Sequence, residues 1–284
     1  MVSNRQRAVV VTGASSGIGE ACALRLDGLG FRVFAGVRRQ QDSDALRRKG
    51  SERLAPVMFD VTDPLSAQSA SDSVAAATGG VGLAGLVNNA GTAVAAPLEF
   101  LPLGELRKQL EVNVVGQIAV TQAFLPLLRQ GSGRIVNIGS VSGRIASPLL
   151  GAYTASKFAM EGLTDTLRRE LSPWGVAVSI VEPGRIATPI WEKSLKVADE
   201  LLDALPRRAL ELYGPAIEEV RRGALEAARW GAPPEKVARA VEHALTAKRP
   251  RTRYPVGLDA RLGALLVRLL PDPLLDRILS AYAA

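Results

Sequence analysis

Short runs of apolar, often β-branched residues recur along the chain, and most are followed by a turn and then by a helical pattern. The runs are apolar throughout and do not alternate with polar residues, which indicates strands buried on both faces, as in a parallel sheet. We expect strands at 8–13, 31–37, 54–61, 85–90, 133–140, 175–183 and 252–257, with helices near 17–29, 42–49, 64–77, 103–130, 152–172 and 234–247. This alternation predicts an α/β fold, a doubly wound parallel sheet of about seven strands with right-handed crossovers.

Two segments depart from this alternation. Residues 185–231 show only helical patterning where another strand could follow, and we expect a helical substrate lid there, since such insertions often cover a site. Near the C-terminus the apolar positions have the spacing of one helix face, and two prolines interrupt the pattern at 271 and 273. We predict a single domain over 1–257, with the lid inside it, and a C-terminal amphipathic extension of the same domain over 258–284.

The extension allows three interpretations. It can pack against its own domain or a sister subunit, close over the entrance to the substrate site, or rest on a membrane surface. Arg261, Arg268 and Arg277 alternate there with leucines, a pattern compatible with peripheral membrane contact. The apolar run 262–270 is interrupted by Arg268 and is too short to span a bilayer. Residues 1–7 form a polar lead with no signal-peptide pattern, so we expect a cytoplasmic protein without a transmembrane segment.

Composition narrows the possible chemistry. The net charge is +7, but no basic stripe with interleaved aromatic residues accompanies it, so we predict no nucleic-acid partner and a basic surface that suits a phosphorylated ligand. Cys22 is the single cysteine and His243 the single histidine. One chain therefore cannot build a zinc site of the His/Cys kind, and we predict no metal. His243 is expected on a helix face without a chemical role, so proton transfer falls to Tyr, Lys, Asp or Glu.

A glycine-rich turn follows the first strand, in VVVTGASSGIGEACALRL. Gly13, Gly17 and Gly19 join a buried strand to an amphipathic helix, and a β-carbon there would hold phosphate groups away from the backbone. The spacing departs from G-x-G-x-x-G, yet its place between strand and helix favours a dinucleotide whose pyrophosphate lies at the helix N-terminus. The fold class thus becomes Rossmann-like.

The end of the second strand bears on the cofactor's ribose. The sequence FAGVRRQ offers Arg38 and Arg39 and has no carboxylate before Asp42. A guanidinium matches a 2′-phosphate in charge and geometry, whereas an acidic residue would bind a free 2′-hydroxyl. NADP(H) is therefore preferred, with NAD(H) possible. The alternative is that both arginines only begin a solvated loop.

An ordered set of motifs resembles the short-chain dehydrogenase/reductase family, of the classical type, over roughly residues 7–257. The motifs are TGASSGIG (12–19), NNAG (88–91), NVVG (113–116), Ser140 followed by YTASK (153–157), and PG (183–184) with Thr188. The segments VFAGVRR and SKFAMEGLTDTLRREL look most like the retinol- and 17β-hydroxysteroid-dehydrogenase branch. The resemblance implies an oxidoreductase acting on CH–OH/C=O groups with NAD(P), assembled as a homodimer or homotetramer.

The resemblance also implies roles for individual residues. Asn113, Ser140, Tyr153 and Lys157 would be the catalytic set. The cofactor would be bound around the pyrophosphate by Gly13, Gly17, Ile18 and Gly19, at the 2′-phosphate by Ser15 and Arg38, and at the adenine by Asp60 and Val61. The cleft that holds the cofactor would be lined further along by Asn88, Asn89, Ala90 and Gly91. The nicotinamide would be oriented by Pro183, Ile186 and Thr188. Ser16, Gly184, Tyr153 and Lys157 complete the predicted cofactor set. Asn113 could instead be a buried, satisfied amide, and Asp60 could only cap the next helix.

Tyr153 and Lys157 stand four residues apart on one helix and are therefore neighbours. A free phenol has a pKa of about 10, but a nearby ammonium favours the phenolate, so we expect the pKa of Tyr153 to fall. Tyr153 would then act as general acid or base. Ser140 would hydrogen-bond the reacting oxygen. Lys157 would hold the ribose hydroxyls and pass protons through a water at the Asn113 backbone.

The predicted lid is apolar, with Ile190, Trp191, Leu195, Val197, Leu201 and Leu202 facing SPLLGA (147–152). Such a wall suggests a small lipophilic substrate, a ketone or secondary alcohol of steroid, retinoid or aryl-ketone type. Trp191 could be a lid anchor or a substrate contact. Two alternatives remain open: an NAD-dependent alcohol dehydrogenase of the same family, and a non-catalytic dinucleotide-sensing module.

Overall fold

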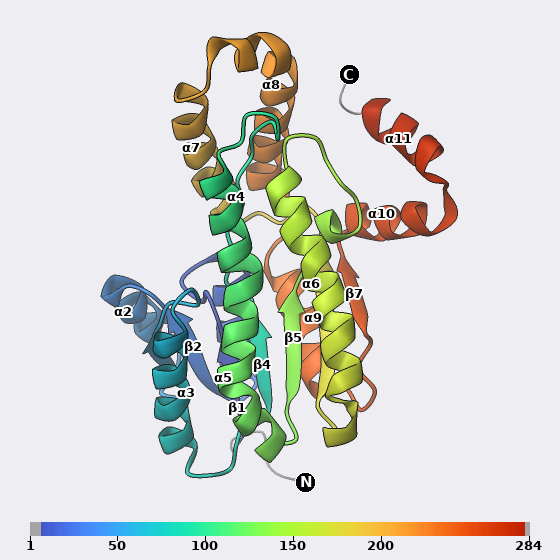
Figure 1. The fold of residues 1–284 in the computed structure, drawn as a ribbon. Helices are drawn as coiled ribbons and strands as arrows, with labels where there is room; N and C mark the ends of the chain where they lie inside the picture. The colour runs from blue at the N-terminus through green and yellow to red at the C-terminus, as the bar shows by residue number, and fades with distance from the viewer. Residues whose placement is uncertain (1–6, 282–284) are drawn as a thin grey trace.

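A computed structural model describes residues 7–281 and contains a seven-stranded, fully parallel sheet (Figure 1). The strands follow the spatial order β3-β2-β1-β4-β5-β6-β7. Their bounds are β1 Ala8–Val11, β2 Arg32–Val37, β3 Leu54–Met58, β4 Gly85–Asn88, β5 Arg134–Ile138, β6 Ala177–Pro183 and β7 Arg253–Val256. The predicted doubly wound α/β sheet is confirmed. Residues 1–6 of the expected polar lead and 282–284 of the expected extension lie outside the described residues.

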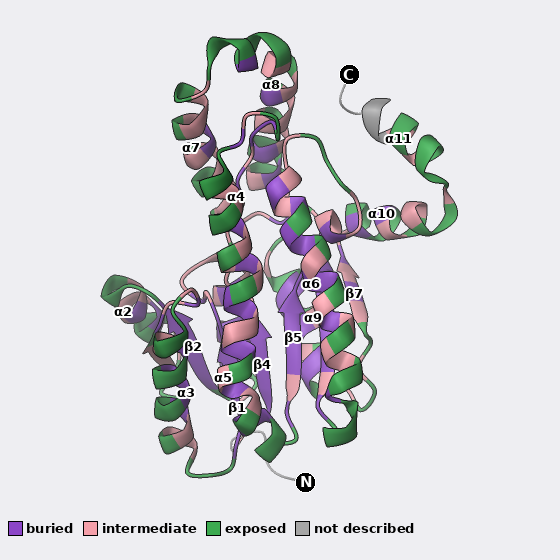
Figure 2. Cartoon of the chain, in the orientation of Figure 1, coloured by how far each residue is buried: buried purple, intermediate pink, exposed green. Residues whose placement is uncertain are grey.

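Helices cover both faces of the sheet because the strands bury both. In β1, Val9 and Val11 join a core with helices α1 (Gly17–Gly28), α2 (Gln40–Lys49) and α9 (Glu235–Thr246). Ala8 and Val10 point to the other face, into a core with α3 (Pro64–Thr78), α5 (Gly116–Gln130) and α6 (Gly151–Glu170). Figure 2 shows the resulting buried sheet between largely exposed outer helix faces. This two-sided burial explains the continuous apolar runs of the sequence.

The strand order reverses direction between β1 and β4. The chain passes from β1 outward to β2 and β3, then returns to β4 on the other side of β1. In open α/β sheets ligands bind beyond the carboxyl ends of the strands at such a point. Several predicted strands ran too far at this edge: β1 ends at Val11, β3 at Met58 and β4 at Asn88. The residues that follow, including the apolar Phe59 and Val61 after β3, belong to loops that leave the sheet and build the region above it.

The long helix predicted at 103–130 is interrupted. It consists of α4 (Leu103–Leu110), a π-helical turn at Glu111–Val115 and then α5. Over residues 7–281 it is the one helix, Leu103–Gln130, whose length and composition would allow it to cross a membrane. Its α5 part packs on the sheet and on α3, and a core helix of an α/β protein passes the same test. The absence of a transmembrane segment stays a prediction.

The segment 185–231 forms two helices, α7 (Ile190–Asp203) and α8 (Arg207–Trp230), which stand beyond the carboxyl ends of the strands (Figure 1). The C-terminal extension forms α10 (Leu258–Leu269) and α11 (Asp272–Ala281). Helix α10 packs against β7 and the short 3-10 turn Val141–Gly143, whereas α11 projects away from the body of the protein (Figure 1). The first half of the extension therefore packs against its own domain, as in the first of the three interpretations of this segment.

Candidate active site

A cavity of about 1100 Å³ runs along the carboxyl ends of the strands, from Arg38 past the glycine turn to Tyr153 and under α7 and α8. Most of the predicted site residues line it. They are Gly13, Ser15, Ser16, Gly17, Ile18, Arg38, Asp60, Val61, Asn89, Ala90, Gly91, Ser140, Tyr153, Lys157, Pro183, Gly184, Ile186 and Thr188. Of the described residues in the predicted set, Asn88, Gly19 and Asn113 do not line this cavity. The structure thus brings together residues as far apart in the chain as Gly13 and Thr188.

The glycines of the turn are required by neighbouring protein atoms. Gly13 and Gly17 have φ of +63° and +59°, in the left-handed region that disfavours other residues. A β-carbon on Gly13 would lie 2.7 Å from the Cα of Ala90, and one on Gly19 would collide with the carbonyl of Gly13 and the amide of Asn89. The expected reason, that β-carbons would displace phosphates, is therefore incomplete: these positions must be glycine even for the turn to pack against the end of β4.

Thr12 and Asn89 fix this packing, and Thr12 is not among the predicted site residues. The hydroxyl of Thr12 accepts hydrogen bonds from the backbone N–H groups of Asn89 (2.8 Å) and Ala90 (2.9 Å). The amide of Asn89 donates to the carbonyls of Thr12 (2.9 Å) and Gly13 (3.1 Å). These hydrogen bonds join the loops after β1 and β4 into one unit at the base of the cavity. Asn88 lies below it and donates to Thr121 and Asn137, both at 2.9 Å, so its side chain supports the sheet edge.

The N-terminus of α1 opens into the cavity. Among the described residues no side chain caps this helix, since the hydroxyl of its N-cap residue Ser16 makes no capping bond. The N–H groups of the first turn are therefore available to an anion, which is the geometry of a pyrophosphate site. Lys193 of α7 reaches the same place, and its Nζ donates to the Ser16 hydroxyl at 3.4 Å. Lys193 is not among the predicted site residues, because nothing in the local pattern of α7 indicates this contact.

The two arginines after β2 differ in their surroundings. Arg39 is engaged by its neighbour Asp42 through hydrogen bonds of 2.8 and 3.0 Å. Arg38 is largely exposed beside the cavity and faces Asp60, with Nη1 3.5 Å from Oδ2. Burial acts to raise the pKa of Asp60, but hydrogen bonds from Thr62 and the charge of Arg38 outweigh it and hold that pKa below its ordinary value. Arg38 is therefore the guanidinium that a bound phosphate could recruit.

Asp60 does not cap the helix that follows it. Its carboxylate accepts from the backbone N–H and the hydroxyl of Thr62, at 2.9 and 2.8 Å. The N-cap of α3 is Asp63, which accepts from the N–H groups of Leu65 and Ser66. The capping alternative for Asp60 is wrong, and its place in the cavity wall is compatible with an adenine contact.

Ser140, Tyr153 and Lys157 meet at the middle of the cavity. Ser140 follows β5, and its hydroxyl accepts from the N–H of Ser142 at 3.1 Å. Tyr153 and Lys157 lie in the first two turns of α6, with the Lys157 ammonium 5.6 Å from the centre of the Tyr153 ring. The Nζ of Lys157 donates to the carbonyl of Ile138 at 2.8 Å, which anchors this buried side chain to the end of β5.

The expected fall in the pKa of Tyr153 is wrong for the protein chain alone. Burial raises the pKa of Tyr153 above its ordinary value, and a hydrogen bond from Ser140 only partly opposes this. Burial also lowers the pKa of Lys157 to about 8, against a smaller upward effect of Glu161. The fall was expected from the charge of the ammonium, but the desolvation of both groups is the larger effect here.

Asn113 lies in the π-helical turn and its side chain is fully engaged. Its Oδ1 accepts from the N–H of Thr92 at 2.9 Å, and its Nδ2 donates to the Thr92 carbonyl at 2.9 Å and to Ser156 at 3.1 Å. Ser156 in turn donates to the carbonyl of Tyr153 at 2.7 Å. The amide is thus satisfied as in the alternative interpretation, and it connects the π-helical turn to α6 next to Tyr153. Such turns occur often at functional sites.

The far end of the cavity is apolar. Ile190, Trp191, Leu195 and Leu202 line it as expected, opposite Pro148, Leu149 and Leu150. Val197 and Leu201, also predicted in the apolar wall, do not line the cavity. They pack against a separate core of Val94, Ala96, Leu101 and Ala152, of which Ala152 belongs to the predicted segment 147–152. Trp191 combines both interpretations, because it lines the cavity while its indole N–H donates to the Ile186 carbonyl at 2.6 Å.

His243 lies on α9 away from this cavity. Its Nδ1 is 2.9 Å from the hydroxyl of Tyr254, which also accepts from the N–H of Arg251 at 2.9 Å. The ring therefore takes part in a hydrogen-bond group at the end of β7.

Comparison with known proteins identifies this arrangement. A family model described as short chain dehydrogenase matches residues 7–198, and these matched residues include the glycine turn, Ser140, Tyr153 and Lys157. The chain belongs to the short-chain dehydrogenase/reductase family. It is 41% identical over 280 residues to retinol dehydrogenase 5 of Mus musculus and 39% identical over 278 residues to 17-beta-hydroxysteroid dehydrogenase type 6 of Bos taurus, covering 96% of this chain and 87% of each relative. The predicted branch of the family is confirmed.

A bacterial relative and two solved structures extend the comparison. The chain is 36% identical to an NADPH-dependent 3-dehydrocapnine reductase of Ornithobacterium rhinotracheale over 277 residues, 96% of this chain and 95% of that protein. A short-chain dehydrogenase/reductase from Burkholderia phymatum, solved with NAD, has a TM-score of 0.77 at 27% identity, with 95% and 94% of the two chains covered. One from Burkholderia cenocepacia J2315, solved with NADP, has a TM-score of 0.74 at 26% identity, covering 95% and 96%. This short-chain dehydrogenase/reductase is therefore an oxidoreductase acting on CH–OH/C=O groups of a small molecule.

Proposed function

We propose that the protein is an NADP(H)-dependent reductase that interconverts a lipophilic ketone and a secondary alcohol. The observation that carries this proposal is the continuity of one cavity with three chemically different parts. A basic end holds Arg38, the middle holds Ser140, Tyr153 and Lys157, and the far end is walled by apolar side chains of α7. A dinucleotide that ran from Arg38 to Tyr153 would leave the apolar end for the substrate.

The residues present fit such a cofactor. The uncapped first turn of α1, with left-handed glycines before it, suits a pyrophosphate. Arg38 supports binding of a 2′-phosphate, since its guanidinium is exposed to the cavity and its nearest carboxylate is 3.5 Å away. When bound, the nicotinamide supplies or accepts the hydride. An NAD-dependent enzyme is the second candidate, favoured by Asp60, which offsets part of the charge of Arg38 and could accept from a free ribose hydroxyl.

Tyr153 acts as general acid in reduction and as general base in oxidation. Its raised pKa keeps the phenol protonated at neutral pH, which suits proton donation to the oxygen of a ketone. Ser140 donates a hydrogen bond to the same oxygen and fixes its orientation. Lys157, anchored on the Ile138 carbonyl, places a buried charge near the ring of Tyr153 and keeps the transferred proton exchangeable. Asn113 holds α6 in register with the π-helical turn through Ser156.

The substrate proposal rests on the apolar end of the cavity and on the names of the relatives. Those relatives are named for retinol, for a 17β-hydroxysteroid and for 3-dehydrocapnine, three different molecules. We therefore propose the class, a bulky lipophilic carbonyl compound or alcohol, with reduction as the direction that NADPH favours. A cytoplasmic location and a homodimer or homotetramer remain parts of this proposal.

The test is a panel of carbonyl compounds followed by NADPH absorbance with the purified full chain. We expect turnover of steroid ketones, retinoid carbonyls or bulky aryl ketones, and little turnover of sugar phosphates or short keto acids. Tight binding of NADPH without oxidation by any member of the panel would contradict the proposal, and faster turnover with NADH than with NADPH would favour the second candidate.

A further inference from the structure

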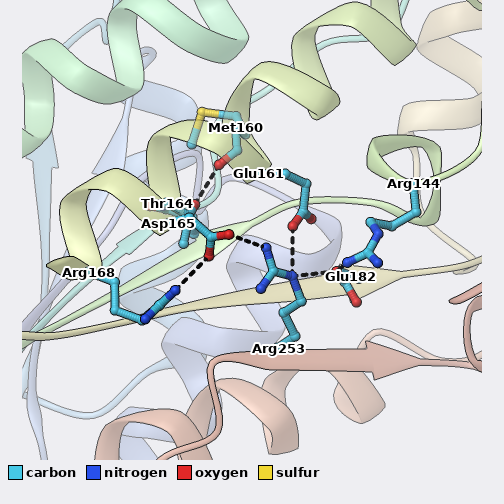
Figure 3. A network of polar contacts seen from close by, with 9 residues as sticks. Arg144, Met160, Glu161, Thr164, Asp165, Arg168, Glu182 and Arg253 are labelled. Carbon is cyan, nitrogen blue, oxygen red and sulfur yellow. Dashed lines mark hydrogen bonds and ion pairs between the residues drawn. The ribbon is translucent and has the colours of Figure 1, made fainter. Parts of the chain in front are cut away.

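Figure 3 shows a cluster of charged residues around Arg253. Its members Glu161, Glu182 and Arg253 do not line the cavity, whereas Lys157, one helical turn before Glu161, does. Glu161 stands one helical turn after Lys157 on α6, Glu182 lies near the end of β6, and Arg253 begins β7. The Nε of Arg253 donates to Glu161 Oε2 at 3.1 Å and is 3.6 Å from Glu182 Oε1. Two carboxylates therefore share one edge of a single guanidinium.

Both carboxylates are removed from water. The side chains of Glu161 and Glu182 are 10% and 3% exposed. Among the described residues, Oε1 of Glu161 is buried without any hydrogen-bond partner. A buried ionised carboxylate normally has its oxygens hydrogen-bonded, so this pair is poorly arranged to carry two full negative charges. A proton held on one of the two carboxyls would relieve both the repulsion and the unpaired oxygen.

The other charged groups around the pair do not remove this problem. Arg144, beyond the Val141–Gly143 turn, lies 3.5 Å from Glu182 Oε1 and is the one further cation in contact with the pair among the described residues. Arg253 is also engaged by Asp165 at 2.9 Å, and Asp165 is itself bonded to Arg168 at 3.2 Å. Figure 3 shows Arg253 between Glu161 and Glu182 on one side and Asp165 on the other.

The titration behaviour agrees with this geometry. Burial, together with the charge of Glu182 and against the opposing charge of Arg253, raises the pKa of Glu161 to about 7. On the other side of Glu161, the pKa of Lys157 is lowered to about 8 by burial, while the charge of Glu161 acts to raise it. The ionisation of Glu161 and that of Lys157 are therefore linked within the range of physiological pH.

We propose that Glu161 is a positioning residue for the reaction: its ionised carboxylate stabilises the Lys157 ammonium, and a proton shared with Glu182 makes that support depend on pH. The proton is exchanged with water, and no other group changes its bonds. This inference rests on the proposed role of Lys157 in the reaction. Neither glutamate touches the substrate cavity, so both act through Lys157.

The test measures Lys157 directly, without turnover. Lysines labelled with ¹³C at Cε are titrated by NMR in the full-length protein, and the Lys157 signal is assigned by its loss in Lys157→Arg. We expect a midpoint near 8 in the wild type. In Glu161→Gln the midpoint should fall by about one pH unit, since an opposite charge one helical turn away is lost. The basic limb of the pH profile for kcat/KM in ketone reduction should fall by the same amount.

Two further variants test whether the change in the Lys157 midpoint comes from the charge of Glu161. Asp165→Asn also removes a carboxylate from Arg253, but Asp165 lies two turns from Lys157, so its midpoint should match the wild type. Glu182→Gln removes the repulsion that favours protonation of Glu161, so the titration midpoint of Lys157 should stay the same or rise. This variant also tests the inference if Glu161→Gln does not fold. An unchanged midpoint in Glu161→Gln, or an equal fall in Asp165→Asn, would overturn the inference. The expected NMR shifts in a protein without carbonyl turnover would instead count against the proposed function.

Discussion

The carboxylate of Asp259 accepts a hydrogen bond from the backbone N–H of Arg185 at 2.6 Å. Asp259 lies in the first turn of α10, and Arg185 begins the loop after β6 that carries Ile186 and Thr188 along the cavity. A β-carbon on Gly184 would collide with the same carboxylate. The C-terminal extension therefore holds the loop that we propose to orient the nicotinamide, through a contact at its first turn.

Replacing Asp259 tests this contact. Asp259→Ala removes the acceptor for Arg185, a bond worth about 1 kcal/mol, and frees the loop. We expect the affinity for NADPH, measured by fluorescence titration, to fall about 3- to 10-fold by the same reasoning. Asp276→Ala on the exposed part of α11 is the control and should bind NADPH like the wild type. Equal affinities in both variants would show that the loop keeps its conformation without the Asp259–Arg185 hydrogen bond.

Tyr153→Phe tests the proposed acid/base group. The variant keeps the ring beside Lys157 but cannot donate a proton, so kcat should fall by about 10²- to 10⁴-fold, while the dissociation constant for NADPH changes little. Tyr254→Phe is the matched control, since it also loses a hydrogen-bonded hydroxyl but lies away from the cavity. Activity of Tyr153→Phe close to that of Tyr254→Phe would remove Tyr153 from the mechanism.

Arg38→Asp tests the preference for NADP(H). The change removes the guanidinium that faces the cavity and adds a charge that repels a 2′-phosphate. We expect the ratio of kcat/KM for NADPH over NADH to fall about 10- to 100-fold, the worth of a charge-assisted phosphate contact. Arg39→Asp should alter this ratio much less, because Arg39 is already bonded to Asp42. If both variants shift the ratio equally, the effect is one of general surface charge.

Lys193→Gln tests a contact between the lid and the cofactor end of the cavity. Lys193 reaches Ser16 at the N-terminus of α1, where a pyrophosphate common to both nicotinamide cofactors would lie. Its loss should therefore raise KM for NADPH and NADH by the same factor, about 3- to 10-fold, unlike the change at Arg38. Lys196→Gln, on the next turn of α7, is the control. A selective effect on NADPH would place Lys193 at the 2′-phosphate instead.

The architecture could be predicted because it depends on periodicity and local chemistry. Continuous apolar runs such as 8–13 identify buried parallel strands, and the order of motifs from Gly13 to Thr188 identifies the family. The ends of the strands could not be placed, because residues such as Val61 remain apolar after leaving the sheet and line the cavity instead.

The site residues could be predicted only where they belong to a sequence motif that indicates their role. Lys193, Asp259 and Glu182 belong to no motif, and although Thr12 begins TGASSGIG and Glu161 lies in SKFAMEGLTDTLRREL, no motif indicates their contacts. Each of these residues matters through a partner far away in the chain. The pKa of Tyr153 was misjudged for a related reason. Its charged neighbour can be read from the spacing, but its burial depends on loops and helices that meet only in the folded protein.

The cluster around Arg253 also predicts an unusual dependence of stability on pH. The folded pKa of Glu161 is about 7, above its ordinary value of 4.5. Between these values the folded protein holds a proton that the unfolded chain has released, so the free energy of unfolding should fall as pH rises from about 5 to about 7. The folded pKa of Lys157 is about 8, below its ordinary 10.5, so stability should rise again as pH increases between those two values.

Urea unfolding across this range separates the two effects. In Glu161→Gln the loss between about pH 5 and 7, on the order of 2 kcal/mol, should disappear, because no carboxyl remains to take up the extra proton. Asp165→Asn should keep that loss, since the pKa of Asp165 is held below its ordinary value by its hydrogen bond to Arg253 and its titration falls at more acidic pH. A wild-type stability that stays level between about pH 5 and 7, or a loss that persists in Glu161→Gln, would mean that Glu161 is ionised throughout and that Arg253 and Arg144 together neutralise the pair.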